Sequence, residues 1–214
     1  MKTTLVLAGL LFGSVAISDL HAQGQFLWGN VLAGVRSPIY GVDPLNPTLI
    51  KIGNTTAGTP PGNQVYGGAL LSGTGFTMAI YLGLSPSEVM ANNTPPSVLG
   101  TAPFRTGNAV GFISGLTTGA DGIPGGTPNV NYQFRAWDNL GGTITSWTQV
   151  MARGGTVPSA MSDVYVFDAA LASGSGSPPL TLGIRSFQLT VVPEPSLIAL
   201  GALGLGALLL RRRK

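Results

Sequence analysis

Alternation of apolar and polar residues is the main pattern between residues 23 and 191 of this chain. Alternating segments predict β-strands, because successive side chains of a strand point to opposite faces of a sheet. The clearest segments are residues 76–82, 130–136, 164–167 and 186–191. Weaker candidates are residues 25–31, 48–52, 109–114 and 143–150. No stretch in this region sustains the apolar spacing of three to four residues that a helix needs, so the pattern predicts an all-β domain.

Two of these segments make more specific predictions. In residues 164–167 both alternating sets are apolar or aromatic, which predicts a strand buried on both faces. In the strand around residues 130–136, Trp137 falls on the same face as Arg135, opposite Phe134. An exposed tryptophan beside an arginine would suit a ligand surface, and Trp147 could extend it. The alternative, which we favour, is a strand buried on both sides with Trp137 in the core.

Turn residues separate the strands, and one short helix is expected among them. Residues 84–92 contain Ser85, Pro86 and Glu88. A serine, a proline in the first turn and a glutamate three residues after the serine form a capping box, which predicts a helix start. Eight to ten short strands at this spacing favour a single β-sandwich, jelly-roll or immunoglobulin-like, over residues 23–191.

The first 22 residues have the layout of a secretory signal peptide. They combine a charged start at Lys2, an apolar core and a small residue at Ala22. Leu20 fits the usual cleavage rule poorly, so the cleavage position is left open, and an uncleaved N-terminal anchor is the alternative. The segment predicts export from the cytoplasm.

Residues 192–214 combine a short proline motif, an apolar run and a basic cluster. The motif is Pro193, Glu194 and Pro195; the uncharged run covers residues 196–210; the basic residues are Arg211, Arg212, Arg213 and Lys214. A helix over the run would span roughly 22 Å, which is short for a hydrocarbon core of about 30 Å. Basic side chains that reach toward the headgroups extend it. We therefore expect a transmembrane helix at residues 196–210, with its basic end in the cytoplasm.

In composition and order this tail resembles the PEP-CTERM sorting signal of Gram-negative bacteria. The resemblance implies that an integral-membrane exosortase recognises Pro193, Glu194 and Pro195 and removes the tail. The alternative is a plain membrane anchor. The segments FTMAIYLG, APFRTGNAVGFISG, VNYQFRAWD and LGIRSFQL are also similar to a layout found in uncharacterised PEP-CTERM proteins of the Verrucomicrobia. That group implies an exported β-rich domain and no particular chemistry.

The charge of the central domain differs from that of the whole chain. The chain has a formal net charge of +3. Residues 23–194 hold six basic and seven acidic residues, a net charge of −1. No basic patch remains to neutralise phosphates, so nucleic acid is not an expected partner. The chain contains no cysteine, and its length suits one exported domain without disulfides.

The residue types missing from the domain restrict its chemistry. The only histidine, His21, lies in the expected signal peptide. The domain therefore lacks the groups for a Ser-His-Asp or Cys-His catalytic set and for the usual zinc or copper sites. No phosphate-binding or dinucleotide motif occurs. We expect no enzyme activity, no metal site and no cofactor.

Two possibilities based on carboxylates stay open. Asp121 and Asp138, each beside a turn residue, could contribute oxygen ligands to calcium. A glycosidase needs only two carboxyl groups, and Glu88 is the single glutamate within the domain. Asp163 and Asp168 are five residues apart, which places them on opposite faces of a strand and makes them a poor acid–base pair.

Together these features predict an exported protein that is held in the inner membrane by its tail and then processed. Its expected destination is the cell envelope or the extracellular matrix, and its expected role is structural or adhesive. The alternative is a carbohydrate-binding module that contacts exopolysaccharide through Trp137 and Trp147.

Overall fold

The computed structural model describes residues 23–174 and 176–191. The expected signal peptide, the Pro193-Glu194-Pro195 motif, the apolar run and the basic cluster Arg211–Lys214 lie outside these residues. Among the residues that the structure describes, no helix is both long enough and apolar enough to cross a membrane.

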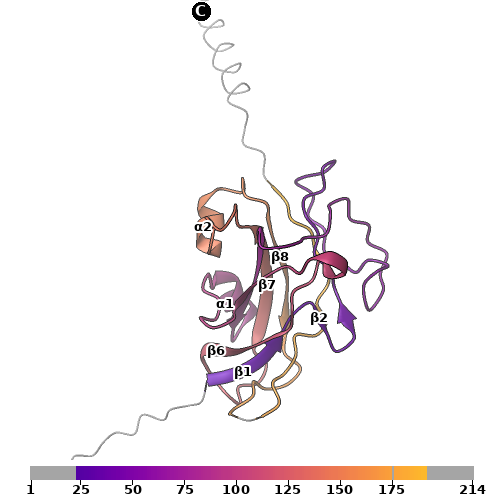
Figure 1. The fold of residues 1–214 in the computed structure, drawn as a ribbon. Helices are drawn as coiled ribbons and strands as arrows, with labels where there is room; N and C mark the ends of the chain where they lie inside the picture. Colours follow the sequence, from indigo (N-terminus) through magenta and orange to yellow (C-terminus); the bar gives the residue numbers. More distant parts are fainter. Residues whose placement is uncertain (1–22, 175, 192–214) are drawn as a thin grey trace, which may run out of the picture.

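A four-stranded antiparallel sheet forms the centre of the domain (Figure 1). Its strands, in spatial order, are β5 (Thr101–Pro103), β4 (Phe76–Gly83), β7 (Asn131–Asp138) and β8 (Ser159–Val166). β4 and β7 pair along their whole length, from Phe76 opposite Asp138 to Gly83 opposite Asn131. The pairing of β7 with β8 shifts register between Gln133 and Arg135. Because β8 is last in the spatial order, it is an edge strand of this sheet.

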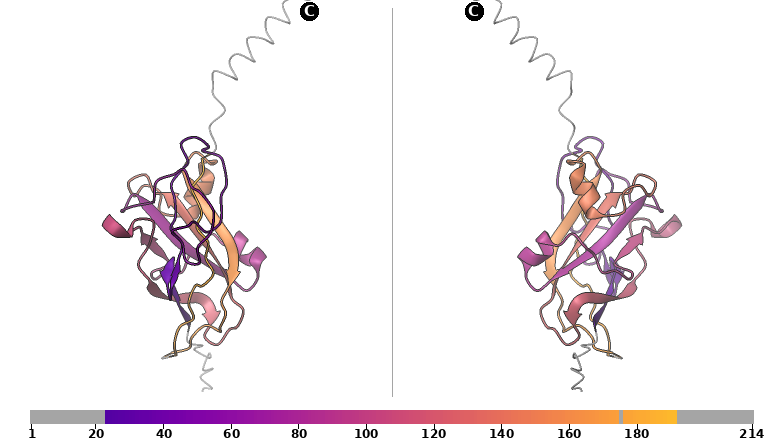
Figure 2. Two further views of the ribbon diagram at one scale, coloured as in Figure 1. Left: turned by 90° about the vertical axis from the view of Figure 1, so that its right-hand side faces the viewer. Right: turned by 90° about the vertical axis from the view of Figure 1, so that its left-hand side faces the viewer.

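Two smaller antiparallel pairs and three short helices complete the domain (Figures 1 and 2). β1 (Gln23–Trp28) pairs with β6 (Leu116–Pro124), and β2 (Val31–Leu32) pairs with β3 (Val35–Arg36). The helices are α1 (Pro86–Ala91), the 3₁₀ helix η1 (Gly107–Ala109) and α2 (Trp147–Ala152). Strands dominate among the described residues, which agrees with the all-β prediction.

The two faces of the central sheet contact different partners. On one face Met78, Ile80 and Phe134 pack with Phe26 and Trp28 of β1 in the larger apolar core. On the other face α1 and α2 cover the sheet. There the smaller core contains Ala79, Tyr81 and Trp137 from the sheet, Val89 from α1 and Trp147 from α2, among others.

The strongest strand predictions are confirmed, because β4 and β7 cover residues 76–82 and 131–136. The prediction that residues 164–167 are buried on both faces is wrong. Val166 is 51% exposed, because β8 lies at the sheet edge. Residues 48–52 and 186–191 form only isolated bridges, such as Ile52 with Phe187 and Ser159 with Thr190.

Two weaker strand predictions are wrong. Within residues 143–150 the chain starts helix α2, with Ser146 as its N-cap. Residues 109–114 hold no strand, and the strand of that region, β6, starts at Leu116. The predicted helix start and the serine half of the capping box are confirmed, because the Ser85 Oγ accepts a hydrogen bond from the Glu88 amide at 3.3 Å. The Glu88 Oε2 accepts from the amide of Leu84, the residue before the cap, at 2.7 Å.

Candidate functional site

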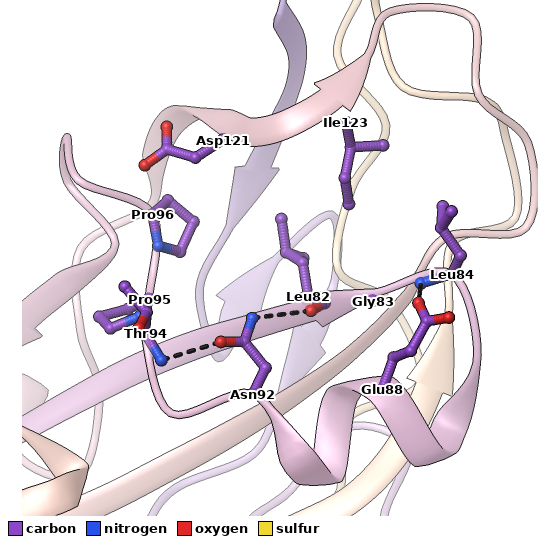
Figure 3. Close-up of a pocket in the computed structure, with 10 residues that line it drawn as sticks. All are labelled: Leu82, Gly83, Leu84, Glu88, Asn92, Thr94, Pro95, Pro96, Asp121 and Ile123. Atoms are coloured by element: carbon purple, nitrogen blue, oxygen red, sulfur yellow. Dashed lines mark hydrogen bonds between the residues drawn. The ribbon is translucent and has the colours of Figure 1, made fainter.

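A pocket of about 460 Å³ lies between α1, the end of β4 and the end of β6 (Figure 3). This volume lies in the range of small-molecule sites, which are concave and mostly apolar with a few polar groups. Its polar side chains are those of Glu88, Asn92, Thr94 and Asp121. Its other lining residues are Leu82, Gly83, Leu84, Pro95, Pro96 and Ile123.

The sequence builds one wall of this pocket through a close approach of β4 to α1. A Cβ atom at Gly83 would lie 2.7 Å from the backbone nitrogen of Val89. Real Cβ contacts are essentially never that short, so a side chain at this position would force α1 away from β4. Gly83 therefore lets the chain turn directly into the Ser85 cap, which begins α1 beside the strand that it has just left.

Asn92 fixes the opposite wall. As the C-cap of α1, it donates from Nδ2 to the carbonyl oxygen of Leu82 at 3.0 Å. Its Oδ1 accepts from the Thr94 amide at 2.9 Å. Both bonds are drawn in Figure 3. They hold the segment before Pro95 and Pro96 against the end of β4, so the pocket wall is preformed.

Two carboxylates line the pocket, one on each side (Figure 3). Glu88 points toward Leu84, where it completes the cap of α1. Asp121 accepts a hydrogen bond from the Ser97 amide at 2.7 Å through Oδ2, and its Oδ1 accepts one from the Gln23 side chain. Each carboxylate is thus held by hydrogen bonds on its own side of the pocket.

The protonation of Asp121 argues against its use as a catalytic acid. Partial desolvation raises the pKa of Asp121, but the hydrogen bonds from Ser97 and Gln23 together outweigh it, so the pKa lies below its usual value. A glycosidase general acid needs a raised pKa, so that it still carries a proton near neutral pH. Asp121 is ionised there, and the geometry supports binding better than proton transfer.

The other predicted carboxylate sites do not assemble among the described residues. Asp163 and Asp168 are exposed, and Asp138 accepts a hydrogen bond from the Leu140 amide at 2.8 Å. No group of three His, Cys, Asp or Glu side chains gathers in the part of the chain that the structure describes. Within the described residues, Asp121 and Asp138 therefore belong to no cluster of three such side chains.

The predicted ligand surface at Arg135, Trp137 and Trp147 is wrong, and the alternative that this strand is buried on both sides is confirmed. Arg135 and Trp137 are 0% exposed and Trp147 is 4% exposed. The physical reason is that α1 and α2 cover this face of the sheet. Alternation along β7 correctly placed Arg135 and Trp137 on one face but did not reveal what covers it.

Arg135 is the centre of this buried face. Its guanidinium carbon lies 4.0 Å from the centre of the Tyr81 ring and 5.3 Å from that of Trp147. The guanidinium also donates hydrogen bonds to four oxygens: Gln133 Oε1 at 3.0 Å, Asn93 Oδ1 at 3.0 Å, Val89 O at 2.8 Å and Met90 O at 3.3 Å. Two of these acceptors are carbonyls near the C-terminus of α1, where a helix favours positive charge.

Burial lowers the pKa of Arg135, and the neighbouring Tyr81 opposes this change. The ordinary pKa of arginine is far above neutral, so the side chain keeps its charge. Its interactions are all with oxygens and rings of the domain itself. Arg135 therefore joins α1, α2 and β7, and it offers nothing to a ligand outside.

No protein-family model matches this chain, and no curated protein or solved structure matches it either. Sequence reasoning found the Ser85–Glu88 cap but missed the pocket beside it. The sequence signals for that pocket were Gly83 directly before the capping box and Asn92 two residues before Thr94.

Proposed function

We propose that this protein is an exported surface domain that is sorted through its tail and then acts by structural or adhesive contacts. The observation that carries the proposal is the order of parts after the domain: Pro193-Glu194-Pro195, the uncharged run of residues 196–210, and Arg211–Lys214. The expected partners are an exosortase and the membrane, followed by the polymers of the envelope or extracellular matrix.

The position of the motif relative to the folded domain supports processing. Val191 is the last described residue, and its amide donates to the Pro47 carbonyl oxygen at 2.9 Å. Only Val192 separates it from Pro193 in the sequence. Proline restricts the residue before it to extended conformations, which favours an extended motif that an enzyme at the membrane surface can grip.

The finer assignment of the fold, a β-sandwich of the jelly-roll or immunoglobulin-like kind, is part of this proposal. Its support is the packing of the β1–β6 pair on one face of the four-stranded sheet through Phe26 and Trp28. A sandwich of this kind suits a rigid module outside the cell, because its core needs neither metal nor disulfide.

An adhesive role is supported by exposed apolar side chains in residues 84–99, the segment that supplies most of the lining of the pocket in Figure 3. Leu84 is 58%, Met90 60%, Val98 63% and Leu99 51% exposed. α1, β1 and β6 lie away from the end of the domain at which the yellow chain stops (Figure 1). A tail-anchored domain would present this part to the surroundings. Carbohydrate binding through Trp137 and Trp147 is not proposed, because both side chains are buried.

The test is the intact mass and membrane fractionation of the native protein, in strains with and without the exosortase. We expect the mature protein to lack the residues after the motif and to leave the inner membrane only when the exosortase is present. A full-length protein that stays in the inner membrane in both strains would contradict sorting. A Glu194→Ala variant that is still processed would contradict recognition of the motif.

The adhesive role has a separate test. The paired variant Leu84→Ser and Val98→Ser removes two exposed apolar contacts beside the pocket without touching the core. We expect the processed variant to be released from the matrix at lower salt or detergent than the unmodified protein. Unchanged retention would contradict adhesion through this part of the domain while leaving sorting intact.

A further inference from the structure

We infer that the end of the domain from which the tail departs carries a second contact with the lipid bilayer, made by an exposed apolar loop. The loop covers residues 43–50, and the surface, which we call the exit face, consists of Leu45, Leu49, Ile50 and Met151. This inference rests on the proposed function, because it takes residues 196–210 to be inserted in the membrane.

The side chains of the exit face are apolar, yet they are strongly exposed to solvent. Leu45 is 86%, Leu49 44%, Ile50 74% and Met151 61% exposed. Residues 44–50 contain no charged side chain. Ile50 and Met151 come from distant parts of the chain, yet both line one groove of about 400 Å³, together with Thr190. The loop and α2 thus form one surface beside the last described residues.

The loop is held in shape by its own hydrogen bonds. The buried carboxylate of Asp43 accepts from the Leu45 amide at 2.9 Å. The Asn46 amide donates to the Asp43 carbonyl at 3.2 Å, and the Leu49 amide donates to the Asn46 carbonyl at 3.1 Å. Two successive turns therefore present the leucine and isoleucine side chains outward, so a membrane contact would need little further ordering of the backbone.

The tail leaves the domain directly beside this loop. The hydrogen bond from the Val191 amide to Pro47 joins the last described residue to the middle of the loop. In Figure 2 the purple chain of this region and the orange α2 lie at the same end of the domain. Any membrane that holds residues 196–210 therefore lies on the side that the exit face occupies.

The short connection keeps this end close to the lipid. Five residue steps lead from Val191 to Ser196, which span at most about 18 Å when fully extended. The headgroup layer on one side of a bilayer takes up about 5–8 Å of that length. The end of the domain at Val191 therefore stays within roughly 10–13 Å of the headgroups even when the connection is stretched. Tethering at this range makes the contact intramolecular, so weak apolar side chains suffice.

The charged groups near the exit face are compatible with this contact. Lys51 follows the loop and donates from Nζ to the Val65 carbonyl at 2.8 Å, and Arg153, two residues after Met151, is exposed. Basic residues beside an apolar patch add attraction to anionic headgroups. The buried Asp43 faces into the loop and places no negative charge on the surface.

The absence of cysteine from the chain allows a direct test with single-cysteine variants of the full-length protein. Ile50→Cys reports on the exit face, Leu84→Cys is a matched control at an exposed apolar position near the pocket of Figure 3, and Leu203→Cys reports on the tail. Each carries an environment-sensitive fluorophore and is reconstituted into vesicles of phosphatidylcholine and phosphatidylglycerol.

Spin-labelled lipids then locate each fluorophore. We expect headgroup spin labels to quench the probe at position 50, with a blue shift of its emission, and to leave the probe at position 84 unchanged. Acyl-chain spin labels should quench the probe at position 203. If position 203 is quenched but positions 50 and 84 behave alike, the exit face makes no bilayer contact, and anchoring by the tail still stands. If position 203 is not quenched, both the anchoring and the exit-face contact are overturned.

Discussion

One face of the central sheet packs against β1, and the other packs against α1 and α2 (Figure 1). The first face buries aromatic and aliphatic side chains alone, with Trp28 stacked near Phe134 at a centroid distance of 5.7 Å. The second face buries an arginine between two aromatic rings. The alternation along β4 and β7 gives each face of the sheet its own set of buried side chains. The apolar face needs only close packing, whereas the face with the arginine also needs hydrogen-bond acceptors for the guanidinium.

The two faces differ in how well they tolerate substitutions of their buried side chains. Apolar cores accept changes of shape at a modest cost as long as volume is kept. A buried guanidinium is different, because every oxygen that it binds loses its partner when the guanidinium is removed. We therefore expect the first face to fail through lost volume and the second through lost hydrogen bonds, and the following variants separate these two mechanisms.

The largest effect is expected from Phe134→Ala on the apolar face. Phe134 is 0% exposed and contacts both Trp28 and Tyr132. Its truncation should lower the free energy of unfolding by about 3–5 kcal/mol. Urea unfolding followed by tryptophan fluorescence measures this loss, with Leu84→Ala as an exposed control that should change little. A loss as small as that of the control would mean that this face is not the main core.

Arg135→Met tests the second face, with a smaller expected loss of about 2–4 kcal/mol. Methionine fills part of the volume but donates nothing to Gln133, Asn93 or the carbonyls of α1. Arg135→Lys should recover only part of the loss, because an ammonium group does not reproduce the planar fork. The matched control is Arg153→Met at an exposed position. If Arg135→Met were as stable as the unmodified protein, the contrast between the faces would disappear.

The Tyr81 ring under Arg135 gives the second face a pH dependence. Burial raises the pKa of Tyr81 to about 12, although Arg135 and the Trp147 backbone lower it. That backbone interaction is weak, since the Tyr81 hydroxyl makes no hydrogen bond of normal geometry among the described residues. In the folded protein the Tyr81 hydroxyl therefore keeps its proton between pH 10 and about 12. In the unfolded chain the same hydroxyl loses its proton over this range.

The stability contributed by protonated Tyr81 is complete below pH 10 and is lost as the pH rises toward 12. The loss should reach about 2–3 kcal/mol. Tyr81→Phe keeps the ring under the guanidinium and should reduce the loss of stability over this range. At neutral pH it should change stability by less than about 1 kcal/mol, because the lost hydroxyl has no partner. Urea titrations at pH 7 and above pH 10 test both statements, and an unchanged alkaline slope would contradict the assignment to Tyr81.

The sequence predicted the elements whose pattern is local and failed where distant segments decide. β4 and β7 were predictable because their alternation is unbroken. β6 was missed because Gly119, the Asp121-Gly122 pair and Pro124 are typical of turns, and only pairing with β1 makes a strand of them. The pairing with β1 also explains the glycine at position 119, since a Cβ atom there would lie 2.6 Å from the Gln23 side chain.

The candidate site was predictable in the same limited sense. The cap at Ser85 and Glu88 follows from four consecutive residues. The pocket beside it also needs Asp121 and Ile123 from a strand more than thirty residues away. The burial of Arg135 depends on α2, whose residues read as a strand because Ile144 and Val150 fit an alternating pattern. No local sequence pattern predicts that α1 and α2 both pack against Arg135.

The smallest effects are expected at the two helix caps, which hold the covering layer of the second face. Ser85 in α1 and Ser146 in α2 each accept a hydrogen bond from the amide three residues later, at 3.3 and 3.4 Å. In each helix the third residue accepts a hydrogen bond from the amide of the residue before the cap, Glu88 from Leu84 and Gln149 from Thr145, both at 2.7 Å. Ser85→Ala and Ser146→Ala should each cost about 1 kcal/mol.

Because the two caps belong to different helices, the double variant should lose the sum of the single losses to within about 0.5 kcal/mol. Thr148→Ala, at an exposed position inside α2, is the matched control for a lost hydroxyl without a lost cap. Urea unfolding of the four variants gives the comparison. If the cap variants lost no more than Thr148→Ala, then α1 and α2 would be held by Arg135 and the aromatic contacts alone. The buried cation would then organise the whole second face, and the contrast with the apolar face would be sharper than the caps suggest.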